Sequence, residues 1–129
     1  MANEHWKNDP EDHDYPAAQH YLHLLFTPSQ AAAIVDQLHV ATTVTFAAKD
    51  LLRASQLELL GRDNAHVQSD LEKVARGERL SPVLLVRGDQ TRALPLVIAD
   101  GYHRVCASYW LDENSAIPAR IAKRPKATP

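Results

Sequence analysis

The sequence predicts an α+β domain in which helices pack against a small mixed sheet. Two apolar runs of strand length, residues 80–86 and 94–99, flank a polar turn, as in a β-hairpin. Residues 65–76 and 101–111 carry apolar positions at helical spacing on either side of that hairpin. The chain has 129 residues, the usual length of one domain, and its 45% apolar content is enough for a core.

The first segment, residues 1–15, is polar and has no hydrophobic period. This composition predicts a flexible N-terminal arm ahead of a single domain over residues 16–122. His5, His13 and His20 lie in or near the arm. We interpret them as solvated side chains, with a metal site as the alternative.

Residues 17–40 are predicted to form a helical hairpin that precedes the rest of the domain. Its second helix begins at Thr27, which can cap the helix, and Pro28 suits the first helical position. Gln30 stands where a capping box requires it.

The core of the domain is predicted over residues 42–122. Residues 42–46 are β-branched and aromatic, which is typical of a strand. Residues 47–55 then predict a short helix, on which Lys49 and Arg53 share a face because they are four residues apart.

The helix over residues 65–76 has a capping residue before it and Gly77 after it. The next strand, residues 80–86, is almost continuously apolar, which indicates that it is covered on both faces. After the helix over 101–111, residues 117–121 predict a last strand. Residues 123–129 are predicted to be a loose basic tail.

The junction between the strand over 94–99 and the following helix is the predicted functional site. The chain turns at Asp100-Gly101, and the first amides of the helix have no partner within it. The helix dipole adds positive potential there, so the junction suits a phosphate or another anion. His103 and Arg104 lie in the first turn and can reinforce that potential.

The order of these elements and the motif Asp100-Gly101-Tyr102-His103-Arg104 resemble the ParB/sulfiredoxin superfamily over roughly residues 42–122. The equivalent junction carries Gly-Glu-Arg-Arg in ParB, Gly-Cys-His-Arg in sulfiredoxin and Asp-Gly-His-His-Arg in the archaeal free-serine kinase, to which this motif is most similar. The resemblance implies that the junction holds the phosphates of ATP, ADP or CTP with Mg²⁺. It also implies that Ser81 lines the nucleotide pocket.

The resemblance has limits that follow from particular positions. The sulfiredoxin nucleophile falls at Tyr102, so cysteine chemistry is not implied here. Cys106, the one cysteine of the chain, lies among apolar neighbours and is interpreted as a buried structural thiol. The helical hairpin over 17–40 has no counterpart in the superfamily.

Each candidate residue has a functional and a structural interpretation. Asp100 can activate a hydroxyl or hold a phosphate-bound Mg²⁺, or it can cap the helix. His103 can act catalytically or donate to a phosphate oxygen, or it can be a surface residue. Arg104 can bind phosphate in bidentate fashion, or form an ordinary salt bridge.

The remaining candidates are Gly101 and Tyr102 at the junction, and Lys49 and Arg53 on a preceding helix. Gly101 permits the sharp turn and a close approach of backbone to ligand. Tyr102 is a core residue or a pocket wall. Lys49 and Arg53 either complete a basic cradle or form an exposed helix face, and no metal ligand set is predicted.

Composition excludes several classes of function. The net charge of −2 argues against unspecific nucleic-acid binding, which needs a basic face. No apolar run approaches the roughly 18 residues of a membrane span. The polar N-terminus lacks the apolar core of a signal peptide, so a cytoplasmic location is expected.

Three functions therefore remain open. The first is a small phosphotransferase or NTPase that acts on a nucleotide or a phosphorylated small molecule. The second is a non-catalytic nucleotide-sensing or protein-interaction module, with a protein partner or a homodimer as its readout. The third is a ParB-like nuclease or DNA-associated protein.

Overall fold

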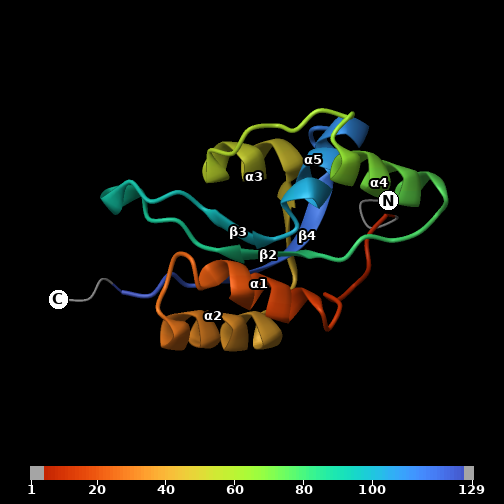
Figure 1. Ribbon diagram of the computed structural model, residues 1–129. Coiled ribbons are helices and arrows are strands. Elements are labelled where there is room, and N and C mark those ends of the chain that lie inside the picture. The colour runs from red at the N-terminus through yellow and green to blue at the C-terminus, as the bar shows by residue number, and fades with distance from the viewer. Residues whose placement is uncertain (1–4, 127–129) are drawn as a thin grey trace.

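The computed structural model describes residues 5–126, and this part of the chain forms a small α+β domain with five α-helices and a four-stranded mixed sheet (Figure 1). The strands are β1 (Val44–Ala47), β2 (Val83–Val86), β3 (Val97–Asp100) and β4 (Ala116–Ala122). Their order in the sheet is β1-β4-β2-β3. β4 is antiparallel to β1 and parallel to β2, and β2 is antiparallel to β3, which confirms the predicted α+β class and the mixed sheet.

Helices cover both faces of the sheet (Figure 1). The helices on one face are α1 (Asp14–Leu22) and α2 (Pro28–Val40), and those on the other are α3 (Ala48–Ser55), α4 (Ala65–Ala75) and α5 (Tyr102–Leu111). Side chains of β2 alternate between the two cores: Leu84 belongs to the α1–α2 side and Leu85 to the other. All four residues of β2 are buried, as its continuous apolar run predicted.

Local sequence signals set the helix ends. Thr27 and Gln30 form the predicted capping box at the start of α2, through both reciprocal hydrogen bonds. The Asn64 side chain accepts from two amides at the start of α4. Cys106 is fully buried in α5, in agreement with a structural thiol.

The segment before α1 packs on the domain, so the prediction of a flexible arm over 1–15 is wrong for residues 5–15. Trp6 is only 2% exposed and belongs to the core on the α3–α5 side. Its neighbours His5 and Lys7 exchange backbone hydrogen bonds of 2.7 and 2.8 Å with Leu80. Residues 1–4 lie outside the described part of the chain.

The predicted tail also departs from expectation at Arg124. Its guanidinium donates to the carbonyls of Arg87 and Pro95, at 3.1 and 2.7 Å, and so closes onto the β2–β3 connection. In β4, the guanidinium of Arg120 reaches the carbonyl oxygens of two α2 residues, the hydroxyl of Tyr15 and two further side chains. Both arginines thereby tie the C-terminal part of the chain to the domain.

No helix within residues 5–126 has the length and hydropathy needed to cross a membrane. Nor does this part of the chain contain a group of three or more His, Cys, Asp or Glu residues arranged to hold a metal ion. His13 lies beside Glu11 and Asp14, and its side chain is 76% exposed.

Candidate functional site

The junction between β3 and α5 has a backbone geometry that only glycine fits. Gly101 has φ +105°, in the left-handed region that side chains disfavour. A Cβ atom at this position would lie 2.5 Å from Cγ1 of Val83 and 2.9 Å from Nη2 of Arg104. The glycine therefore allows both the turn and the close packing of β2, β3 and α5.

The N-terminus of α5 is not capped by a side chain of the described residues. The first backbone bond of the helix runs from the amide of Val105 to the carbonyl of Gly101. The amides of residues 102–104 precede that bond, so they have no acceptor within the helix. Asp100 does not cap the helix, which removes the structural interpretation that its position suggested.

A cavity of about 240 Å³, which we call the junction pocket, opens beside this helix end. One side comes from the β3–α5 turn and the other from α4. The lining residues are His66, Ser69, Asp70, Lys73, Asp100, Gly101, His103 and Arg104. Every lining side chain is polar or charged, so the pocket suits a small polar or ionic group rather than an apolar one.

Arg104 lines the pocket but is also tied to the protein. Its Nη2 lies 2.9 Å from Oδ2 of Asp100 and donates at 3.4 Å to the carbonyl of Pro82. Its side chain is 17% exposed, and its Nε atom is buried with no hydrogen-bond partner among the described residues. The salt-bridge interpretation of Arg104 thus holds, while part of its hydrogen-bonding capacity remains unused.

Two carboxyl groups share the pocket with the cations. Burial raises the pKa of Asp70, and Lys73, Arg104 and the nearby histidines oppose this shift. Burial also raises the pKa of Asp100, against the pull of Arg104. The two carboxyl groups thus lie in the same pocket as the cations Lys73 and Arg104.

His103 is a group whose protonation can change the net charge of the pocket. The rings of His66 and His103 lie 4.6 Å apart, centroid to centroid. Burial, together with His66, lowers the pKa of His103, and Asp70 opposes the shift. Protonation of the His103 ring would add positive charge next to the uncapped end of α5.

The structure brings together four of the predicted site residues and separates the others. Asp100, Gly101, His103 and Arg104 line the junction pocket. The Tyr102 side chain instead packs on the core and its hydroxyl donates to the carbonyl of Glu58.

The other candidates lie away from the junction pocket. Ser81 is buried next to the start of β2 and is not part of the lining. Lys49 is exposed on α3 and lines neither this pocket nor a second one. Arg53 lines that second, larger pocket, between α3 and the β2–β3 hairpin, so the basic cradle expected from Lys49 and Arg53 is not formed at the junction.

The sequence analysis did not identify three pocket residues on α4, namely Ser69, Asp70 and Lys73. The signal was present, because these residues and His66 follow the i, i+3, i+4, i+7 spacing of one helix face. What the sequence lacked was the packing of α4 against α5, a contact between separate elements. Asp70 in particular is a buried carboxylate, which is a common mark of a functional site.

Comparisons of this chain with protein-family models, with curated proteins and with solved structures find no match. Its function is therefore inferred from the geometry and chemistry of the junction pocket.

Proposed function

We propose that the junction pocket binds the phosphate group of a nucleotide or of another phosphorylated small molecule. One observation carries the proposal: the uncapped N-terminus of α5 and the cations Arg104 and Lys73 adjoin the same 240 Å³ cavity. Backbone amides at a helix N-terminus favour anions, and a guanidinium adds charge-assisted hydrogen bonds.

The size and lining of the pocket favour a phosphate group over a whole nucleotide inside it. No apolar side chain lines the cavity, and its only rings are the imidazoles of His66 and His103. Its volume of about 240 Å³ lies below the range usual for pockets that enclose a whole small-molecule ligand. A nucleoside attached to the bound phosphate would extend beyond the pocket. The resemblance of the junction motif to the ParB/sulfiredoxin superfamily supports ATP, ADP and CTP, with and without Mg²⁺, as the first ligands to test.

A binding role without catalysis is favoured by the state of Asp100. Its Oδ2 atom already pairs with Nη2 of Arg104 at 2.9 Å, which opposes proton transfer from a substrate hydroxyl to that oxygen. His103 is the better candidate base if the protein does transfer a phosphoryl group. Burial lowers its pKa and thus favours the neutral imidazole.

A nucleic-acid function has less support. The junction pocket combines cations with two carboxyl groups, and the whole chain has a net charge of −2. Both features oppose the broad phosphate contacts that such binding requires.

Isothermal titration calorimetry with inorganic phosphate, pyrophosphate and the three nucleotides tests the proposal, with thermal shifts as a second readout. Lys73→Ala is the test variant, because Lys73 makes only a 4.0 Å contact with Asp70. The loss of one charged contact should weaken binding about tenfold. Lys49→Ala, which removes the same charge from an exposed position on α3, should bind like the wild type.

The outcomes are distinct. Absence of binding by every phosphate compound would overturn the proposal, and so would equal weakening by the two lysine variants. Release of inorganic phosphate from a bound nucleotide, lost in His103→Gln, would establish the enzymatic form of the function. Binding without release would establish the sensing form.

A further inference from the structure

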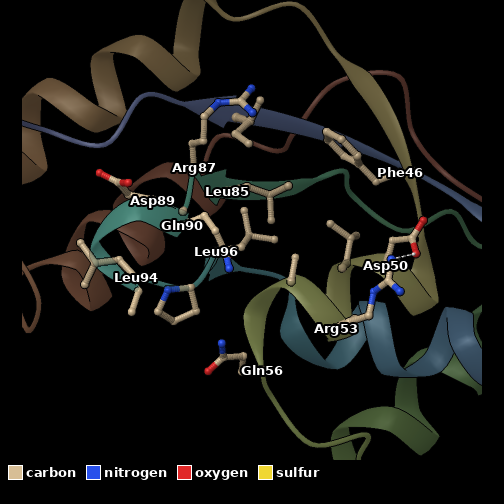
Figure 2. A pocket seen from close by; sticks show the side chains of 16 residues that line it. Phe46, Asp50, Arg53, Gln56, Leu85, Arg87, Asp89, Gln90, Leu94 and Leu96 are labelled. Atoms are coloured by element: carbon tan, nitrogen blue, oxygen red, sulfur yellow. Dashed lines mark hydrogen bonds and ion pairs between the residues drawn. The ribbon is translucent and has the colours of Figure 1, made fainter.

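A second pocket lies at the opposite end of β2 and β3 from the junction pocket. It has a volume of about 640 Å³, within the range of small-molecule sites, and we call it the hairpin pocket. One wall is α3 and the other is the β2–β3 connection, which includes a 3₁₀ turn over Gln90–Arg92. Figure 2 shows Leu85 and Leu96 between Arg53 on α3 and Arg87 on the connection.

The interior of the hairpin pocket is apolar. Its apolar lining consists of Phe46, Leu51, Ala54, Leu85, Ala93, Leu94, Pro95, Leu96 and Ile121. Several of these side chains, among them Leu96 and Ile121, are only partly buried, so apolar surface is left facing the cavity. Covering that surface with an apolar ligand would be favourable.

The rim of the pocket carries cations that the protein leaves incompletely paired. Arg87 is exposed and has no ion pair within residues 5–126. Arg53 has an 85% exposed side chain, and its contact with Asp50 is long, at 3.5 Å. A ligand carboxylate could therefore pair with either guanidinium without breaking a strong bond.

The one carboxylate on the hairpin side of the rim is already occupied. Oδ2 of Asp89 lies 2.7 Å from Nε of Arg92, and Oδ1 accepts from the amide and the hydroxyl of Thr91. Arg124 adds a further positive charge, since its guanidinium binds the carbonyl of the lining residue Pro95. The hairpin side of the pocket thus has an excess of positive charge.

We infer that the hairpin pocket binds a small amphipathic organic carboxylate, with its apolar body against Leu96 and Ile121 and its carboxylate on Arg87 or Arg53. The combination of an apolar floor and an under-paired cationic rim selects this class over neutral or cationic ligands. The site is separate from the junction pocket, so the inference does not depend on phosphate binding.

Three carboxylates serve as probes, 4-phenylbutyrate, octanoate and 1-naphthoate, each compared with its neutral amide. Binding is followed through the methyl NMR signals of Leu96 and Ile121. At least one carboxylate should shift these signals and bind about tenfold more tightly than its amide, as expected for loss of a charged hydrogen bond. Arg87→Met together with Arg53→Met should remove that difference, whereas Arg79→Met, on the exposed surface outside the pocket, should leave it intact.

A filling variant locates the ligand. Ala54 is exposed on α3 and lines the pocket, so Ala54→Phe should occupy the cavity and abolish probe binding without unfolding the domain. Ala75→Phe, at an exposed position on α4, is the matched control and should bind normally.

Three results would overturn the inference. The first is no methyl shift with any of the carboxylates, and the second is equal affinity for acid and amide. The third is self-association of the wild type, by sedimentation, that Ala54→Phe abolishes while no carboxylate binds. In that case the pocket is a contact surface for a second copy of the chain.

Discussion

Replacing Gly101 by alanine should destabilise the protein more than the same change at Gly77. Both residues have positive φ angles, +105° and +82°, so both substitutions impose backbone strain of about 1–3 kcal/mol. At Gly77 a new Cβ atom would meet nothing within 4 Å. At Gly101 it would lie 2.5 Å from Val83, which adds an overpacking cost of about 1–3 kcal/mol.

The comparison is made by urea denaturation of the two variants and the wild type. Gly101→Ala should lose roughly 2–6 kcal/mol of unfolding free energy, and Gly77→Ala about 1–3 kcal/mol, with unchanged m-values. Adding Val83→Ala removes the Cγ1 atom that the new methyl group meets. The double variant should therefore be less destabilised than the sum of the two single changes. Equal losses at the two glycines would refute the packing argument for the junction.

Four further predictions concern single side chains. Trp6→Ala should lower the unfolding free energy by about 3–5 kcal/mol, because Trp6 is buried in the core. The control Leu24→Ala, at a 79% exposed position, should lower it by no more than about 0.5 kcal/mol. A loss in Trp6→Ala as small as that in Leu24→Ala would mean that the N-terminal segment is not part of the core. Hydrogen bonds lower the pKa of Asp89 from 3.8 to about 2, so the stability that its carboxylate contributes is present above pH 3.8 and is lost as pH falls toward 2. In Asp89→Asn the urea midpoint should therefore vary less with pH between these two values than in the wild type, and an unchanged pH profile would contradict this. Burial raises the pKa of Asp70, so the folded state favours the protonated carboxyl and the protein loses stability as pH rises and this group ionises. Asp70→Asn should therefore be at least as stable as the wild type at neutral pH. Because the variant lacks a negative charge in the pocket, it should also bind phosphate roughly fivefold more tightly by calorimetry. The affinity for sulfate, which stays a dianion over this range, should rise as pH falls below the ordinary histidine pKa of 6.5, and His103→Gln should reduce that rise; a pH-independent affinity would show that the His103 imidazole does not face the anion.

Local signals explain why much of the fold could be predicted. The start of α2 was predicted from Thr27 and Gln30, since the atoms that satisfy the cap lie within three residues of each other. The buried character of β2 follows from its own unbroken apolar run. The prediction of a flexible N-terminal segment was wrong because the average composition of the segment is polar, while a single residue, Trp6, packs in the core. An average over a window does not detect such an anchor.

In the candidate site too, the residues of one local motif could be predicted, whereas those brought in by packing between helices could not. Asp100, Gly101, His103 and Arg104 are contiguous with one turn, so the strand-to-helix motif was sufficient to place them together. The opposite wall of the pocket depends on how α4 packs on α5, which no local pattern encodes. Arg53 was misplaced because α3 buries its Leu51 side, and this orientation turns the basic face away from the junction.

The strand order has a consequence for folding of the chain. In the sheet, β1 hydrogen-bonds only to β4, and β4 also forms the parallel ladder with β2. A chain without Ala116–Ala122 could still form the antiparallel pair of β2 and β3, but β1 would have no neighbour in the sheet. β4 therefore connects β1 to the β2–β3 pair, and the closure of this long-range pairing should limit the folding rate of the domain.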